Sequence, residues 1–138
     1  MKEYFEDFRK IQKNEINKTN DKQMINKIQI LKLARKYFKT FSNKDIGGLE
    51  KMFTKDIKLL AFDGEAIGIE NVLNVNKQIF NSVNEIEVKP LNVFVDEKKK
   101  VAVGDLIINT NGSFALKVVD ILIFTDKGKI KTIKAYKG

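Results

Sequence analysis

Four residues stand where their side chains could take part in acid–base chemistry: Tyr37, Asp63, Asp105 and Asp120. Asp120 interrupts the apolar run Val118–Phe124. Because side chains alternate along a strand, both faces available to Asp120 are apolar. A carboxyl group in such surroundings must be paired, hydrogen-bonded or protonated. Asp120 is therefore a candidate buried acid, and an ion pair with Lys134 on the neighbouring predicted strand is the structural alternative.

The other three candidates each have a structural explanation beside a functional one. Asp105 shares a face of its predicted strand with Val101, Val103 and Ile107, and an edge position facing solvent would account for it. Asp63 directly precedes Gly64, and this pair is typical of a turn. Tyr37 borders the apolar stripe of a predicted helix, and tyrosine is common at the margin of a core.

The chain contains neither cysteine nor histidine. The first absence excludes disulfides, zinc–thiolate sites, iron–sulfur clusters and cysteine nucleophiles. The second removes the commonest general base and excludes Ser-His-Asp catalysis. No carboxylate cluster has the spacing of metal ligands, so we expect no metal and no cofactor. Any acid–base chemistry must come from Asp, Glu, Tyr or Lys.

The net charge of +8 suggests a nucleic-acid partner, but the residue types do not. Of the 26 basic residues only Arg9 and Arg35 are arginine, whereas nucleic-acid interfaces more often combine arginine with aromatic residues. The first residues include Glu3, Glu6 and Asp7, where an export signal would be basic and then apolar. No apolar run reaches the roughly 20 residues needed to cross a bilayer. We expect a cytoplasmic protein that binds neither membrane nor nucleic acid.

The length of 138 residues indicates one domain. Residues 1–20 are a polar extension in which Tyr4, Phe8 and Ile11 have the spacing of a short helix, and residues 21–138 form the domain. Within the domain, apolar periodicity predicts helices over residues 21–41, 46–53 and 68–83, and strands over residues 57–62, 85–95, 101–109, 114–125 and 129–136.

Turn and breaker residues separate these elements. Asn111-Gly112 predicts a hairpin, and Pro90 predicts an edge or a bulge within its strand. The last four strands follow one another as an antiparallel meander. Strands segregated from helices indicate an α+β fold, here a curved antiparallel sheet wrapped around the long first helix, which Asp21 would cap, with two shorter helices.

Two segments near the C-terminus carry a resemblance to a known family. Residues 115–124 contain a Val-Asp strand that ends in Phe, and residues 126–136 contain an Asp/Gly turn, Lys-Ile and a final Ala-Tyr. This stretch resembles the closing hairpin of the nuclear transport factor 2-like superfamily, closest to its ketosteroid isomerase and SnoaL-like polyketide cyclase branches. Residues 37–57 match as well, and the resemblance covers residues 27–138. It implies a cone-shaped sheet with an interior cavity, and a homodimer formed through the outer face of the sheet.

The resemblance also implies roles for the candidate residues. Ketosteroid isomerases use a carboxylate base and an oxyanion hole made of a tyrosine and a protonated aspartic acid. Tyr37 falls on that tyrosine and Asp120 on that aspartic acid. Ala61 occupies the position of the base. Asp63, two residues later in the strand, or Asp105 would then have to act as the base.

Three functions follow as hypotheses. The chain could enolise a hydrophobic ketone as an isomerase or cyclase, which requires Asp63 or Asp105 to face the cavity opposite Tyr37 and Asp120. It could bind a small apolar ligand without catalysis. It could be a dimerisation or protein-interaction module, in which case the cavity should be filled by Phe38, Phe62, Phe80 and Phe114.

Overall fold

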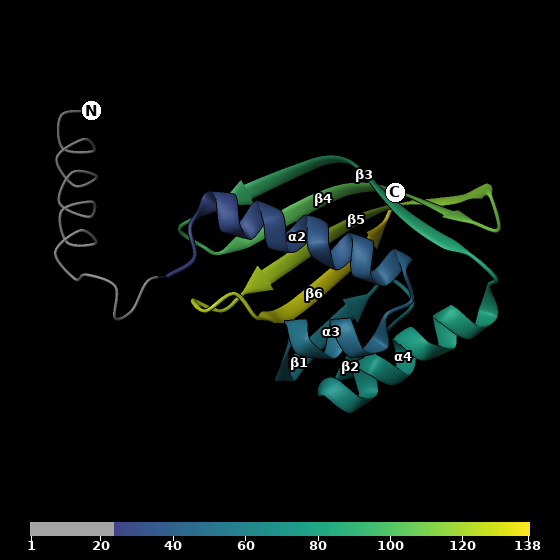
Figure 1. Ribbon diagram of the computed structural model, residues 1–138, viewed down its shortest axis with the longest axis horizontal. Coiled ribbons are helices and arrows are strands. Elements are labelled where there is room, and N and C mark those ends of the chain that lie inside the picture. The colour runs from purple at the N-terminus through teal and green to yellow at the C-terminus, as the bar shows by residue number, and fades with distance from the viewer. Residues whose placement is uncertain (1–23) are drawn as a thin grey trace, which may run out of the picture.

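The computed structural model describes residues 24–138, so the helix predicted within residues 1–20 lies outside the described residues. The helices and strands follow in the order α2 (Lys27–Ser42), α3 (Ile46–Met52), β1 (Phe53–Ala61), β2 (Gly64–Ile67), α4 (Ile69–Ser82), β3 (Ile86–Asp96), β4 (Val101–Thr110), β5 (Ser113–Phe124) and β6 (Ile130–Lys137). A curved sheet carries the helices on one side, with α2 lying across its concave face (Figure 1). The predicted α+β fold is confirmed. Among the described residues, no helix has both the length and the apolar character needed to cross a membrane.

The sheet has six strands in the order β2-β1-β6-β5-β4-β3. The predicted antiparallel meander from β3 to β6 is confirmed. The expectation of a wholly antiparallel sheet is wrong, because β1 pairs with β6 in parallel. The strand β2 was not predicted. It is only four residues long, which is too short to show a period of two, and it forms by folding back onto β1.

Local hydrogen bonds decide where α2 begins and ends. The side chain of Asn26 accepts a bond from Gln29 N at 2.9 Å, and the Gln29 side chain accepts one from Asn26 N at 2.8 Å. This reciprocal cap starts the helix at Lys27, so the N-cap predicted at Asp21 is wrong. At the other end Ser42 Oγ donates to Phe38 O and accepts from Val88 N, which ties the helix to β3.

The predicted irregularity at Pro90 is present as a register shift between Pro90 and Asn92 in the pairing of β3 with β4. The helix α2 packs Ile30, Ala34, Tyr37 and Phe38 into the core. Gly104 on β4 makes room for Phe38, since a Cβ at Gly104 would lie 2.7 Å from Phe38 Cζ. The large ring therefore stands directly against the concave face of the sheet.

A lysine attaches α4 to the end of α2. Lys44, which has a φ of 54°, donates from Nζ to the carbonyl oxygens of Phe80, Val83 and Asn84 at 2.8, 2.5 and 3.0 Å. A cation is favourable at a helix C-terminus because carbonyl groups there lack partners within the helix. These bonds hold the C-terminal end of α4 next to the end of α2.

Candidate functional site

One row of residues crosses the concave face of the sheet. The strand register pairs Gly104 with Asp120, Asp120 with Ala135, and Ala135 with Ala61. Residues paired directly across a ladder share a face of the sheet, and Gly104 faces Phe38 on α2. Asp120 therefore points to the helix-covered interior, with the small residues Ala135 and Ala61 beside it.

The structure brings Tyr37 close to Asp120. The Tyr37 side chain is 5% exposed, and its ring lies 5.6 Å from that of Phe38 and 6.2 Å from those of Phe41 and Phe53, measured between centroids. Burial raises the pKa of Tyr37 well above its ordinary value, and the negative charge of Asp120 raises it further. Burial also raises the pKa of Asp120 from 3.8 to about 7. Around neutral pH, the interior thus holds a hydroxyl donor and a carboxyl group that is a donor when protonated.

Asp120 does not pair with Lys134, the partner considered from the sequence. Lys134 lies opposite Ile121, the residue after Asp120, and therefore on the outer face of the sheet. Burial is the cause of the raised pKa of Asp120. The carboxyl group is thus left available to a bound molecule.

The structure does not bring Asp63 or Asp105 to this pair. Asp105 lies opposite Val119, on the outer face, where its Oδ2 accepts a hydrogen bond from Asn92 Nδ2 at 3.3 Å. Asp63 is exposed in the turn between β1 and β2. Asp63 would share a strand face with Ala61 only if β1 continued to residue 63. The strand ends at Ala61, so the expected alternation does not reach Asp63. Neither carboxylate is placed to take a proton from a molecule held by Tyr37 and Asp120.

Two of the four phenylalanines expected to fill the interior do so. Phe38 and Phe80 are 1% and 6% exposed. Phe62 and Phe114 are 51% and 62% exposed. The interior is therefore filled around α2 but not by all of the large side chains that the interaction hypothesis requires.

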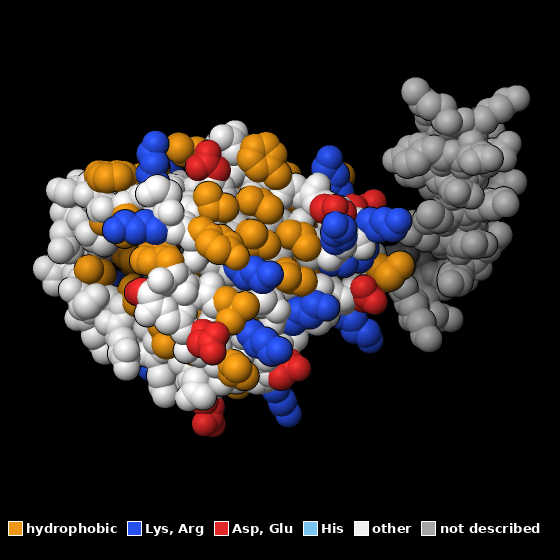
Figure 2. Space-filling view, turned by 180° about the vertical axis from the view of Figure 1, so that it is seen from behind, with side chains coloured by type: hydrophobic (Ala, Val, Ile, Leu, Met, Phe, Trp, Pro, Cys, Tyr) orange, Lys and Arg blue, Asp and Glu red, His pale blue; other side chains and the backbone are white. Residues whose placement is uncertain are grey.

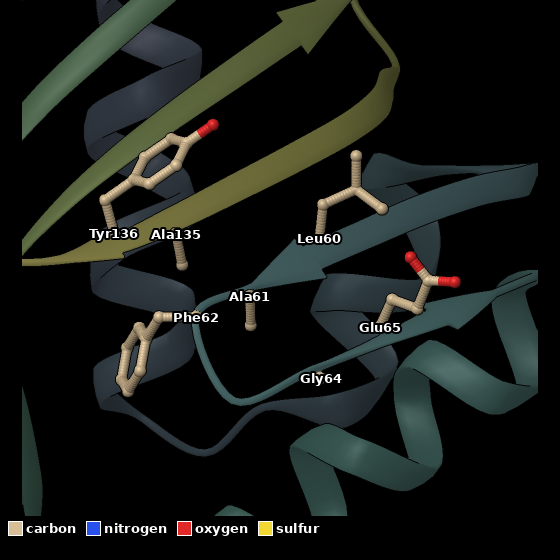
Figure 3. A pocket seen from close by; sticks show the side chains of 7 residues that line it. All are labelled: Leu60, Ala61, Phe62, Gly64, Glu65, Ala135 and Tyr136. Atoms are coloured by element: carbon tan, nitrogen blue, oxygen red, sulfur yellow. The ribbon is translucent and has the colours of Figure 1, made fainter.

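A hollow of about 430 Å³ lies where β1 turns into β2 beside β6. Its lining consists of Leu60, Ala61, Phe62, Gly64, Glu65, Ala135 and Tyr136 (Figure 3). The side chains of Ala61 and Ala135 point to the opposite side of the strands from those of Leu60 and Tyr136 (Figure 3). Both alanines belong to the row of Asp120, whereas Tyr37 and Asp120 themselves do not line the hollow. Sequence reasoning missed Ala135 and Tyr136 as lining residues and used the Ala-Tyr pair only as part of the family resemblance.

The arrangement is suited to holding one oxygen atom of a bound molecule. Two donors in an apolar surrounding stabilise an oxygen that carries or develops negative charge. Within residues 24–138, no group of three acidic side chains comes together as a metal site. The chemistry that Tyr37 and Asp120 offer is hydrogen bonding and proton donation.

Comparisons with known proteins agree with this architecture. The chain is similar in structure to a protein of unknown function with a cystatin-like fold from Methylobium petroleophilum (TM-score 0.73, 14% identity, covering 83% of this chain and 79% of the other). It is also similar to a proposed ketosteroid isomerase from Kribbella flavida (TM-score 0.68, 17% identity, covering 80% of this chain and 78% of the other). A third similar structure is a proposed polyketide cyclase from Sinorhizobium meliloti (TM-score 0.66, 18% identity, covering 76% of this chain and 94% of the other). At these identities the likeness shows the fold alone.

A search of the curated proteins finds no match to this sequence. The model of the SnoaL-like domain matches residues 34–133, which is most of the chain and includes Tyr37, Ala61 and Asp120. The protein therefore belongs to the family of SnoaL-like domains.

Proposed function

We propose that this protein binds a small, largely apolar molecule through a carbonyl or phenolic oxygen held by Tyr37 and Asp120. The observation that carries the proposal is the position of the Asp120 carboxyl group on the concave face, next to Tyr37 and without a cationic partner among the described residues. A carboxyl group kept in an apolar interior is costly to the fold unless it is protonated or bound. A ligand oxygen would supply the missing contact.

The surroundings of the pair fit the rest of such a molecule. The nearby hollow has a volume of about 430 Å³, within the range of small-molecule sites. Its small residues Ala61 and Ala135 leave space, and the exposed rings of Phe62 and Tyr136 offer apolar surface at its rim. The size and lining favour an aromatic or alicyclic ligand of one to three rings.

Enolisation of a ketone is the finer possibility, as in ketosteroid isomerases, which the sequence resembles. Two donors at the carbonyl oxygen would stabilise an enolate. Abstraction of the α-proton needs a base within hydrogen-bond reach, and Ala61 occupies the position that the resemblance assigns to it. We therefore propose ligand binding as the function and expect the wild-type chain to enolise ketones slowly.

Binding of 2-naphthol is expected to raise the melting temperature of the protein by mass action. The shift should shrink as pH rises through about 7, because ionised Asp120 can no longer donate to the naphthol oxygen. In Asp120→Asn, whose amide donates at every pH, the shift should stay constant over that range. Tyr37→Phe should bind roughly fivefold to tenfold more weakly at every pH, the value of one hydrogen bond.

The measurement is a thermal-shift titration from about pH 5.5 to 8.5, below the ionisation of naphthol itself. Asp105→Asn, on the outer face, is the matched control and should behave as the wild type does. Absence of any shift in the wild type, or equal binding by Tyr37→Phe, would rule out the proposed site.

A second candidate function is homodimerisation, and the outer face of the sheet favours it. On this face Phe94 lies opposite Val103, and Val103 opposite Ile121, while Val119 lies opposite Tyr136. Phe94 and Tyr136 are 61% and 52% exposed. Figure 2 shows hydrophobic side chains gathered at the centre of this face with lysines beside them. We propose that two copies of the chain pair through it, since contiguous apolar surface of this kind commonly marks an interface.

Sedimentation equilibrium tests the dimer. The wild type is expected at twice the chain mass of 15.8 kDa, and Ile121→Glu, which places a charge within the apolar surface, at the chain mass itself. Phe114→Glu is the control, because Phe114 is an exposed apolar residue that lies near the tip of the β4–β5 hairpin, away from the centre of the apolar surface. A wild type that sediments as a monomer up to about 100 µM, a concentration at which a dimer of micromolar Kd would form, would refute the proposal.

A further inference from the structure

A polar side chain is buried on α4 without a hydrogen-bond partner for its nitrogen. Asn76 is 4% exposed, and its Nδ2 finds no acceptor among the described residues. The other buried polar atom without a partner, Thr54 Oγ1, belongs to a residue that is only partly buried. Because a buried unpaired donor destabilises a fold, a side chain of this kind calls for an explanation.

The helix directs Asn76 into the same interior that contains Tyr37. Val72, Asn76 and Phe80 recur every four residues and are all buried, so they share the inner face of α4. The ring of Phe80 lies 4.8 Å from that of Phe41, and the ring of Phe41 lies 6.2 Å from that of Tyr37. A line of rings thus runs from Tyr37 through Phe41 to Phe80, and Asn76 lies one helical turn before Phe80 on α4.

The two polar features lie on different walls of the interior. Tyr37 belongs to α2 and Asp120 to β5, whereas Asn76 belongs to α4, which packs on β1 and is held in place by Lys44. A molecule held by Tyr37 and Asp120 meets Asn76 only if its other end extends from the strands toward the inner face of α4. An amide there offers a neutral donor at every pH.

We infer that Asn76 Nδ2 donates a hydrogen bond to a second acceptor atom of the ligand, so that the site selects apolar molecules with an oxygen at each end. This inference rests on the proposed binding function and specifies its ligand class. A buried donor that only the ligand can satisfy rejects an otherwise equal molecule that lacks the acceptor. Asn76 is then a specificity-determining residue.

The ligand-free protein provides the first test. Leucine has nearly the shape of asparagine without its polar atoms, so Asn76→Leu should melt at a higher temperature than the wild type if the amide is unpaired. The neighbouring exposed residue Asn74 provides the matched control, since Asn74→Leu should leave the melting temperature nearly unchanged. A lower melting temperature of Asn76→Leu would mean that the amide has a structural partner, and would overturn the inference.

Ligand selectivity provides the second test, which does not depend on stability. The probes are 6-acetyl-2-naphthol and 6-isopropyl-2-naphthol, which have the same shape and differ in the acceptor oxygen. The wild type should prefer the acetyl compound, and Asn76→Leu should lose roughly fivefold to tenfold of that preference, the value of one hydrogen bond. Because the preference is compared between the wild type and Asn76→Leu, differences in acidity and hydration between the two probes cancel.

The two levels of the proposal fail differently. If the wild type binds 2-naphthol but Asn76→Leu keeps the full preference for the acetyl compound, the role of Asn76 is wrong and the Tyr37–Asp120 site stands. If the wild type binds none of the three naphthols, both the site and the role of Asn76 are wrong. Loss of the preference with retained binding of 2-naphthol is the expected result.

Discussion

Replacing Asp120 with asparagine is expected to stabilise the folded protein at pH 8 and to leave its stability nearly unchanged at pH 4. Burial raises the pKa of Asp120 in the folded state from 3.8 to about 7. Between these two values the folded state keeps a proton that the unfolded state has released, so the contribution of Asp120 to stability is lost as pH rises from about 4 to 7. Asparagine has no such dependence.

The size of the gain in stability follows from how far burial raises the pKa of Asp120. A rise of the pKa from 3.8 to about 7 would correspond to about 4 kcal/mol if the carboxyl group were wholly enclosed. Asp120 is partly exposed, so we expect the variant to gain between about 2 and 4 kcal/mol at pH 8. This is a large part of the stability of a domain of this size.

Urea unfolding at unit steps from about pH 4 to 8 measures the effect as the difference between variant and wild type. Subtracting the unfolding free energy of the wild type from that of the variant cancels the contributions of all other carboxyl groups. Asp105→Asn, whose carboxyl group is on the outer face, should show no comparable trend. A difference that is independent of pH would mean that Asp120 ionises normally and is not held in an apolar interior.

Replacing Ala61 with aspartate is expected to turn the binding site into an enolising one. Ala61 shares the row and face of Asp120 and lies two strands away, at a backbone separation of about 10 Å. It also lines the hollow beside the pair. A carboxylate introduced there would stand across from a ketone oxygen held by Tyr37 and Asp120. A positioned general base contributes roughly 10²–10⁴-fold to such a reaction.

Exchange of the α-protons of 2-tetralone in D₂O, followed by proton NMR, measures this gain. Ala61→Asp should exchange the ketone at least about 100-fold faster than Ala61→Asn, which has the same shape without a base. Adding Tyr37→Phe to Ala61→Asp should remove much of the gain, because an oxyanion donor is then lost. Equal rates for the aspartate and asparagine variants would show that position 61 does not face the bound ketone.

These two predictions concern two different parts of one site. The first concerns a carboxyl group that the fold keeps in an apolar interior, and the second concerns a base that the chain lacks. Together they would describe a SnoaL-like domain that retains the oxygen-binding half of an enolising site. The wild-type protein is then expected to bind its ligand and to enolise ketones only slowly.

Much of the fold could be predicted from the sequence because it depends on local patterns. The three helices of the described residues follow from apolar residues at helical spacing. The hairpin at Asn111-Gly112 forms where both residues adopt positive φ values of 53° and 79°, which these two residue types tolerate. Apolar neighbours on both sides were enough to indicate that Asp120 lies in apolar surroundings.

The tertiary structure decided which face of each strand meets the helices. Alternation determines that Asp105 and Gly104 point in opposite directions, but only the contact of Gly104 with Phe38 shows that Asp105 is the one outside. The parallel pairing of β1 with β6 brings Ala61 into the row of Asp120, although the two are far apart in the sequence. No local pattern contains such a pairing.

The same reason explains what sequence reasoning missed in the site. Asn76 has the spacing of a buried helix position, yet its lack of a partner depends on every side chain packed around it. The pKa of Asp120 depends on how much water the folded interior excludes. The sequence by itself thus determined most of the helices and strands and included Tyr37 and Asp120 among its candidate residues. Long-range packing decided which candidates face one another, because burial and pairing are properties of the whole fold.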